Sequence, residues 1–465
     1  MNPARSDSFS MTASEKRTAV SLSSVYAMRM LGLFMILPVF SLYADHLEGN
    51  TPLLIGMAIG IYGLSQALLQ IPFGLASDRL GRKPVIIFGL LLFVAGSVIA
   101  AMSESIYGVI IGRAIQGSGA IAAAVMALAA DLSREEQRTK VMAMIGMSIG
   151  MAFALALLLG PLLNSWIGVP GIFWLTAVLA SISIIIIKFA VPTAVHSRVH
   201  RDAQPVVDQL SSVMTDPQLL RLDAGIFILH VILTATFVVL PLALRDYSGL
   251  DAMHHWQVYL PALILSVAGM IPFIILAEKH RRMKQVFVGA IVVLAFSEIG
   301  LRLFYESLTG LFITIFVFFL AFNLLEATLP SLVSKIAPPD KKGSAMGMYS
   351  SSQFFGAFVG GVTGGWLYGQ YGVEGVFSFS ASIAALWVVI ASSMRSPRYL
   401  ITRLINIGNV SEEEAKRLTL QMTKVTGVAE VTIILEEGVA YLKVDKHALD
   451  EEALNKFSSL NSLND

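Results

Sequence analysis

The chain has 465 residues, of which 55% are hydrophobic and only 14% charged, and its formal net charge is +1. This composition excludes an ordinary soluble globular protein, and the near-zero net charge gives no indication of a nucleic-acid partner. With no cysteine, the chain can form neither a disulfide nor a thiolate metal site or nucleophile. We therefore expect an all-α polytopic membrane protein.

Twelve apolar runs are long enough to cross the hydrocarbon of a bilayer, which needs about 20 helical residues. The first run is too long for a signal-peptide core, so we expect a retained span behind a cytoplasmic tail, residues 1–17. The predicted spans are residues 18–43, 53–76, 84–103, 106–131, 141–166, 171–191, 222–245, 256–277, 285–305, 308–334, 343–369 and 373–394.

The distribution of Lys and Arg predicts the orientation of these spans. The loops 77–83, 132–140, 278–284 and 335–342 carry three, three, four and three such residues, whereas the external connections contain Arg245 alone. By the positive-inside rule the basic loops are cytoplasmic, and an even number of spans places both termini on that side.

A polar run, residues 192–221, interrupts the apolar spans and predicts a cytoplasmic linker with an amphipathic segment on the membrane surface. It divides the membrane region into two six-helix halves, residues 18–191 and 222–394. Two such halves with a substrate between them near the midplane allow a transporter to rock between two open faces.

The connection between the second and third spans, residues 74–83, reads GLASDRLGRK. This ordered string resembles the G-x-x-x-D-R-x-G-R-[RK] signature of the major facilitator superfamily of transporters. The resemblance implies a conformational latch in which Asp131, at the inner end of span 4, pairs with Arg82 and holds the halves together in the outward-open state. A surface pair of Asp131 with Arg134 is the alternative. The matching loop residues are Gly74, Asp78, Arg79, Gly81, Arg82 and Lys83.

Span 4 contains a second string, Gly112 to Ala120, which resembles the R-x-x-Q-G-x-G-A signature of the same superfamily. The matching polar residues are Arg113 and Gln116, and the resemblance implies that Arg113 participates in proton coupling. A buried Arg is costly in a membrane and must face a polar cavity or a partner. The alternative is a structural Arg neutralised by backbone carbonyls or an acid.

Glycines in span 5 resemble the signature of proton-coupled antiporters, which ends in G-P-x-x-G-G. Gly150 and Gly160-Pro161 match, with Gly146 before them, but the last two glycines are missing. Because small residues in membrane helices mainly allow close packing, this string indicates antiport only weakly.

Few ionisable residues lie within the predicted spans. Glu298 and Arg302 are four residues apart, and we interpret them as neutralising each other on one helix face. Glu326 stands in mid-span with no opposite charge within a turn, near Asn323. It is either a proton-carrying group or a partner for Arg29 or Arg113 in the other half; His230 in span 7 adds a further titratable side chain.

Beyond Pro397 the apolar runs shorten and charge returns, which predicts a cytoplasmic domain, residues 397–465. We expect a strand at 399–407, a helix at 411–426 begun by a capping box, strands at 429–436 and 439–445 joined by a turn at Glu437-Gly438, and a helix at 450–460. The order β-α-β-β-α predicts a small α+β domain of the ferredoxin-like type that serves as a binding or regulatory module rather than an enzyme.

The spans, the signatures and the tail together resemble the YajR-type transporters, proton-driven drug-efflux permeases of Gram-negative bacteria whose tail is called the YAM domain. The resemblance implies an inner-membrane antiporter that exports small, mostly apolar compounds and uses protons, with no metal or other cofactor. The expected partners are a small-molecule substrate, protons, membrane lipids and a small ligand or protein at the tail. A proton-independent facilitator or lipid permease, and a membrane sensor, are the alternatives; the sequence contains no enzyme motif.

Overall fold

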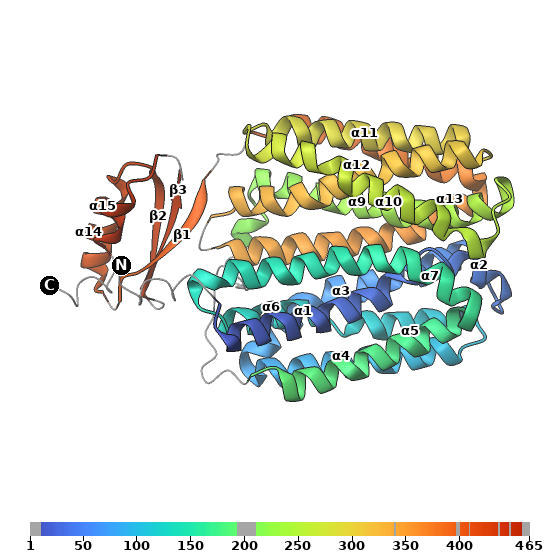
Figure 1. The fold of residues 1–465 in the computed structure, drawn as a ribbon, viewed down its shortest axis with the longest axis horizontal. Coiled ribbons are helices and arrows are strands. Elements are labelled where there is room, and N and C mark those ends of the chain that lie inside the picture. Colours follow the sequence, from blue (N-terminus) through green and yellow to red (C-terminus); the bar gives the residue numbers. More distant parts are fainter. Residues whose placement is uncertain are drawn as a thin grey trace.

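The computed structural model describes residues 11–192, 211–338, 341–396, 400–408, 410–435, 438–445 and 448–457. Most of the predicted linker, the break at Pro397 and the turn residue Glu437 lie outside these ranges. The described chain forms a long helical bundle with a small mixed domain at one end (Figure 1). We call this end of the bundle domain-proximal and the other end domain-distal.

The first half begins with α1 (Ala13–Phe34), in which Thr12 and Glu15 form a capping box. It continues through the helices that follow in chain order. These are α2 (Phe40–Tyr43), the 3-10 turn η3 (Ala44–His46), α3 (Pro52–Leu80), α4 (Arg82–Met102), α5 (Ile106–Ser118), α6 (Ala122–Asp131), α7 (Glu135–Ile185) and the π-helical turn η4 (Ile186–Ala190).

The second half begins at α9 (Pro217–Leu242), five residues before the predicted span, because Asp216 caps the helix and Pro217 occupies its first position. The rest of this half is helical as well. Its elements are η5 (Ala243–Tyr247), η6 (Ala252–His254), α10 (Trp256–Glu278), α11 (Met283–Phe304), α12 (Leu308–Ile336) and α13 (Lys342–Ser392).

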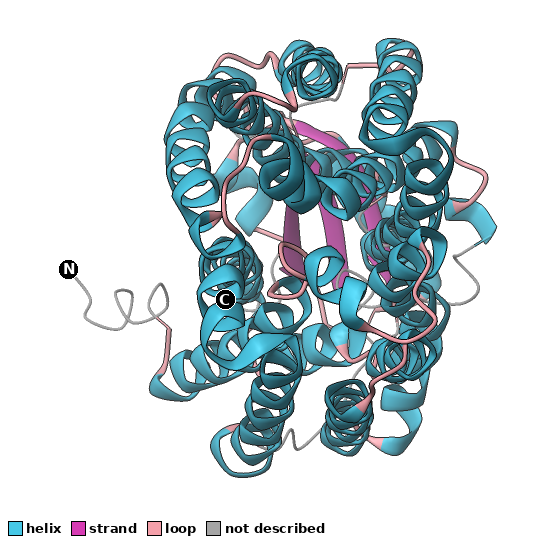
Figure 2. Cartoon of the chain, turned by 90° about the vertical axis from the view of Figure 1, so that its right-hand side faces the viewer, coloured by secondary structure: helices cyan, strands magenta, loops and turns pink. Residues whose placement is uncertain are grey.

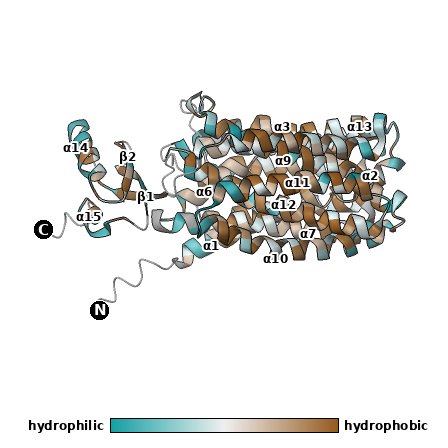
Figure 3. Cartoon of the chain, turned by 90° about the horizontal axis from the view of Figure 1, so that it is seen from above, coloured by the Kyte–Doolittle hydropathy of each residue, from teal (hydrophilic) through white to brown (hydrophobic). Residues whose placement is uncertain are grey.

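Within the described residues, nine helical segments are long and apolar enough to cross a membrane. Two helices, α7 and α13, have 51 residues each, so a straight helix would measure about 77 Å against about 30 Å of hydrocarbon. Each is in fact two helices that meet at a glycine with positive φ, Gly168 (φ 67°) or Gly372 (φ 65°). The bundle is hydrophobic along its middle and more hydrophilic at both ends (Figure 3).

The connection between α3 and α4 is shorter than the predicted loop, residues 77–83. Helix α3 continues to Leu80 and α4 starts at Arg82, so that Gly81 alone separates them. Gly81 has φ 92°, a conformation that a residue with a Cβ adopts only under strain. The charged side chains of this stretch are therefore fixed on helix termini rather than on an irregular loop.

The two halves pack closely at the domain-distal end, where glycines of α3 meet α13. A Cβ built on Gly56 would lie 2.0 Å from the carbonyl oxygen of Gly361, and one on Gly365 would lie 2.2 Å from that of Pro52. Asp45 and Arg245 add an ion pair of 3.3 Å between the halves at the same end. Viewed end-on, the helices form a single bundle, with the sheet of the C-terminal domain behind it (Figure 2).

The C-terminal domain contains β1 (Ile401–Asn406), α14 (Glu412–Thr423), β2 (Val428–Ile434), β3 (Val439–Val444) and α15 (Glu451–Asn455), in the predicted order. The three strands are antiparallel in the order β1-β3-β2, which is consistent with the expected α+β domain. Its two helices lie on the side of the sheet that faces away from the bundle (Figure 1). The other face of the sheet is thus turned toward the membrane domain.

Candidate functional site

A cluster of charged side chains surrounds the α3–α4 junction at the domain-proximal end. Arg82 is 5% exposed and donates from Nε to Asp131 Oδ2 at 3.1 Å and from Nη1 to Ser77 Oγ at 2.8 Å. It also pairs with Asp78, one turn earlier. The pairing of Arg82 with Asp131 is the contact that the signature implied, and Ser77 is a further member that the pattern did not indicate.

All members of this cluster belong to α3, α4 and α6 in the first half, so the Arg82–Asp131 pair connects helices within that half. The surface alternative for Asp131 is wrong, because Arg134 instead donates from Nε to Glu15 Oε1 at 2.9 Å. This hydrogen bond is the main reason that the pKa of Glu15 falls to about 2. Glu15 thereby fixes the start of α1 to the start of α7.

The remaining signature residues of the junction have simpler surroundings. Lys83 donates from Nζ to the carbonyl oxygen of Val191 at 2.5 Å, which joins α4 to the end of the first half. Arg79 is exposed. The carbonyl of Gly74 accepts a hydrogen bond of 2.7 Å from Ser77 Oγ.

Arg113 on α5 is 2% exposed and is held by backbone carbonyls. Its Nε and Nη2 donate to Ala58 and Ile59 of α3 at 3.4 and 3.3 Å, and Nη1 donates to Gln116 at 3.1 Å. The guanidinium lies 5.2 Å from the ring centre of Tyr62. These are the contacts of the structural alternative, in which carbonyl oxygens and a π face solvate the charge.

Arg29 on α1 forms a second buried cationic centre beside it. Its Nη2 donates to Gln66 Oε1 at 2.6 Å and to the carbonyl of Gly119 at 3.0 Å. Gln66 donates in turn to Gln70 at 3.1 Å. Neither Arg29 nor Arg113 forms an ion pair with Glu326, so the proposed partnership across the interface is wrong for this conformation.

The partner of Glu326 is His230. Glu326 on α12 places Oε1 3.4 Å from Nε2 of His230 on α9, and the same ring nitrogen lies 3.0 Å from Gln353 Nε2 on α13. The other ring nitrogen of His230 lies 3.2 Å from the carbonyl of Ile226. The Glu326 side chain is 29% exposed, but the Oε1 atom that faces His230 is buried and has no hydrogen-bond partner among the described residues.

Two polar residues that sequence analysis did not single out extend this cluster toward the domain-proximal end. Asp223 lies two turns before His230 on α9 and is 7% exposed, and its Oδ2 has no hydrogen-bond partner among the described residues. Tyr349, one turn before Gln353 on α13, interacts electrostatically with both Glu326 and Asp223. Asp223 precedes His230 by seven residues and Tyr349 precedes Gln353 by four, and both spacings place side chains on one helix face. This periodicity is the sequence signal that could have indicated the two residues.

Three other residues of the predicted spans, Glu298, Arg302 and Asn323, also have defined partners. Glu298 accepts a hydrogen bond of 3.0 Å from Thr236, whereas Arg302 points to Glu374 at 3.9 Å, so the pairing of Glu298 with Arg302 is wrong. Asn323 donates to Ser266 on α10 at 3.0 Å and is thus a packing contact between two helices of the second half.

The span 5 glycines differ in their surroundings. A Cβ on Gly160 would lie 2.6 Å from the carbonyl oxygen of Met35, so Gly160 permits the close approach of α7 to the chain that follows α1. Gly150, like Gly146, has no neighbour that a Cβ would meet within 4 Å. Pro161 lies inside α7.

Of the two helical halves, one contains the buried basic groups and the other the acidic groups. This arrangement defines a membrane transporter rather than an enzyme. The family model of the Major Facilitator Superfamily matches residues 22–297 and 255–403. The chain belongs to this superfamily.

Several proteins resemble this chain. The inner membrane transport protein YajR of Escherichia coli (strain K12) is 47% identical over 438 residues, which cover 94% of this chain and 96% of that protein. The multidrug resistance protein MdtH of Proteus mirabilis (strain HI4320) is 25% identical over 73% of this chain and 84% of its own length. The crystal structure of a mutant of the nucleoside transporter NupG shares the fold, with a TM-score of 0.63 and 14% identity over 81% of this chain and 99% of that one.

Proposed function

We propose that this transporter is a proton-coupled antiporter that exports small, mostly apolar compounds across the bacterial inner membrane by alternating access. The observation that carries the proposal is the cluster of Glu326, His230 and Gln353 on three helices of the second half. The similarity to an inner membrane transport protein and to a multidrug resistance protein supports the location and the substrate class.

The proposed topology has twelve spans with both termini in the cytoplasm. The nine apolar segments support it when the bends at Gly168 and Gly372 are counted as turns between spans and α1 is added as the first span. The domain-proximal end of the bundle is then the cytoplasmic end, which agrees with its basic loops.

The Glu326 cluster has the chemistry of a site that loads and releases a proton. A carboxyl group and an imidazole 3.4 Å apart are close enough to titrate as a coupled pair, and the amide of Gln353 holds the imidazole without a charge of its own. Glu326 stands ten residues before the end of α12, about 15 Å from the proposed cytoplasmic surface. Asp223 and Tyr349 stand six and seven residues after the first residues of α9 and α13, nearer that surface than Glu326, which supports a polar route for the proton.

The close packing of α3 on α13 at the external end, together with the partial exposure of Glu326, supports an inward-facing arrangement in this structure. We further propose that Asp78, Arg82 and Asp131 act as a conformational latch. Since Arg82 and Asp131 both belong to the first half, the latch would act by making that half rigid and by positioning Asp78 for the second half.

A regulatory role for the C-terminal domain is supported by its contacts with the membrane domain. Lys443 on β3 is 3% exposed and donates from Nζ to the carbonyls of Ser334 and Lys335, the last turn of α12, at 3.3 and 2.8 Å. Asp445 pairs with Arg281 at 3.3 Å, in the connection between α10 and α11. Both contacts lie on the second half, so the domain would move with that half.

One observation favours a transporter without proton coupling. Arg113 is solvated by the carbonyls of Ala58 and Ile59 and by Gln116, as a purely structural Arg would be. Everted vesicles with a fluorescent pH probe distinguish the two functions. We expect the addition of a transported compound to dissipate an imposed pH gradient; compound uptake with an unchanged gradient would establish the facilitator.

A further inference from the structure

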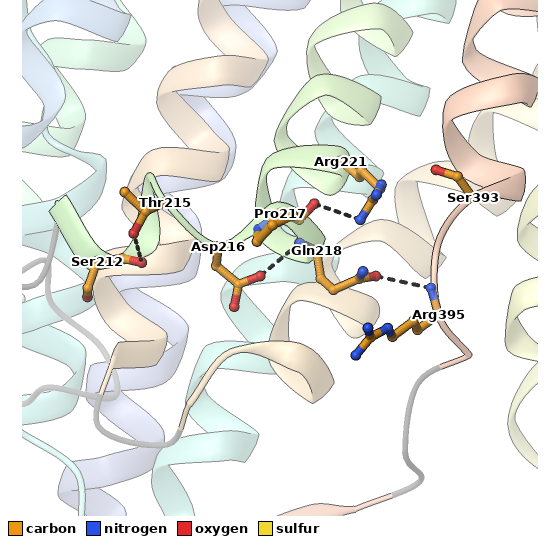
Figure 4. Close-up of a pocket in the computed structure, with 8 residues that line it drawn as sticks. All are labelled: Ser212, Thr215, Asp216, Pro217, Gln218, Arg221, Ser393 and Arg395. Atoms are coloured by element: carbon orange, nitrogen blue, oxygen red, sulfur yellow. Dashed lines mark hydrogen bonds between the residues drawn. The ribbon is translucent and has the colours of Figure 1, made fainter.

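A polar cavity of about 680 Å³ opens at the domain-proximal ends of α9 and α13 (Figure 4). Ser212 and Thr215, which precede α9, lie at one end of it, and Ser393 and Arg395, which follow α13, lie at the other. Apart from Pro217, every residue in its lining is polar or charged. It is separate from the Glu326 cluster, which stands much deeper in the bundle.

Two guanidinium groups of this cavity have no acidic partner among the residues that the structure describes. Arg221 donates from Nη1 only to the carbonyl of Pro217 in its own helix, at 3.2 Å. Arg395 is exposed, and its backbone N–H donates to Gln218 Oε1 at 3.1 Å. The carboxylate of Asp216 is occupied as the cap of α9, since its Oδ1 accepts from the backbone N–H groups two and three residues further on, at 2.7 and 3.3 Å.

A second cavity of about 260 Å³ shares Gln218 and Arg395 with the first and extends the basic surface toward the C-terminal domain. Lys335 and Lys443 contribute to its lining together with one acid, Glu430. The two cavities adjoin at Gln218 and Arg395, and we call them together the cleft; its basic residues outnumber its acidic ones.

Two exposed apolar residues are adjacent in the sequence to residues that line the first cavity. Met214 is 53% exposed and Leu220, beside Arg221 on the first turn of α9, is 44% exposed. Exposed apolar groups that border a basic, hydroxyl-lined cavity at a membrane surface match an amphiphile whose headgroup is anionic.

We propose that this cleft binds a phosphate ester, held by the guanidinium groups of Arg221 and Arg395. Thr215, whose hydroxyl donates to the carbonyls of Ser211 and Ser212 at 3.2 and 3.1 Å, lines the cavity together with Ser212. Guanidinium groups are suited to phosphate oxygens because their donors are arranged in a planar fork. The apolar border indicates that the ester is the headgroup of an anionic phospholipid of the cytoplasmic leaflet rather than a free metabolite. Its binding would link α9 to the end of α13, where the C-terminal domain is attached.

The test is a binding measurement on the purified full chain, and it does not depend on the proposed antiport. Melting temperatures are compared in nanodiscs of phosphatidylcholine alone and of phosphatidylcholine mixed with phosphatidylglycerol. In phosphatidylcholine, glycerol phosphate is titrated as the soluble source of the same group. The Arg221→Gln/Arg395→Gln double variant is the probe, and Arg282→Gln, an exposed Arg of another proximal connection, is the matched control.

We expect phosphatidylglycerol to raise the melting temperature of the wild-type chain and of Arg282→Gln, and the double variant to bind it at least about tenfold more weakly. An equal effect of glycerol phosphate would support the same site with a soluble ligand. Equal stabilisation of the double variant and the wild-type chain, or no stabilisation by either phosphate source, would overturn the proposal. The melting temperature in phosphatidylcholine alone verifies that the double variant is folded.

Discussion

Replacement of Glu326 by Gln tests the proposed coupling site directly. The amide keeps the volume of the side chain and can donate to His230, which lies 3.4 Å from the carboxylate, but it cannot exchange a proton. Because Arg113 is held by carbonyls and not by Glu326, the change leaves no buried Arg without a partner. Because Glu326 Oε1 has no hydrogen-bond partner among the described residues, the substitution removes no hydrogen bond there. We therefore expect a stability change within about 1.5 kcal/mol, and not the loss of about 3–5 kcal/mol of a broken buried ion pair.

The effect of Glu326→Gln on transport is larger than its effect on stability, and it can be calculated from the pH gradient. A pH difference of one unit supplies about 1.4 kcal/mol for each coupled proton, which is about a tenfold accumulation of the compound. A variant without the exchangeable proton retains substrate binding and downhill movement, so its accumulation ratio falls to about one, with no gain from the gradient.

The assay uses proteoliposomes with an imposed pH gradient and a fluorescent compound, after the thermal stability of the purified variant has been measured. Glu298→Gln is the matched control, because Glu298 is another acid within a membrane helix but bonds to Thr236 and lies outside the cluster. A stable Glu326→Gln protein with undiminished gradient-driven accumulation would remove this residue from the mechanism.

Two further predictions concern the junction and the C-terminal domain. Asp78→Asn and Arg82→Ala should slow conformational exchange while the chain still inserts into the membrane. Their effects should not add to that of Asp131→Asn, because residues of one charge network are coupled by about 0.5–3 kcal/mol. Additive effects on the exchange rate in single-molecule distance measurements would argue against a latch. Removal of residues 396–465 should leave a folded, inserted transporter with altered regulation, since the helical halves form their own core; absence of the truncated chain from the membrane would contradict this.

The fold could be predicted from the sequence where local patterns determine it. Apolar runs located the membrane helices, and the short amphipathic segments after residue 400 located the strands and helices of the domain. The resemblance of the signature string implied the pairing of Arg82 with Asp131, and the structure contains this contact. Helix ends were less accurate: residues 77–80 were assigned to a loop, but they belong to α3, which ends at Leu80.

The Glu326 cluster could not be predicted, because its members come from three helices that are far apart in the sequence. Asp223 and Tyr349 are far apart in the sequence, and only the packing of α9 on α13 brings them together. The pairing of Glu298 with Arg302 failed for a different reason. Four residues along α11 carry Arg302 to the surface, where its long side chain reaches Glu374, while Glu298 remains inside against Thr236.

The attachment of the C-terminal domain through Lys443 leads to the last prediction. Two hydrogen bonds from a charged donor to the end of α12 stabilise docking by about 3–6 kcal/mol. Burial lowers the pKa of Lys443 from 10.5 to about 8, which costs the charged form about 3 kcal/mol. Because gain and cost are similar, Lys443 contributes little net free energy to docking, so a change in its charge should shift the docking equilibrium.

The sign of the pH dependence follows from this shift. The docked ammonium has the lower pKa, so the docked state binds fewer protons between pH 8 and pH 10.5, and docking should strengthen as the pH rises through that window and be constant below it. Since the chain has no cysteine, spin labels at Gln285→Cys and Lys424→Cys can report the distance between domain and bundle. Lys443→Met should abolish the pH dependence, whereas Lys416→Met, on the exposed face of α14, should preserve it. A distance that stays constant from about pH 7 to about pH 10 in the wild-type chain would show that the charge of Lys443 does not control docking.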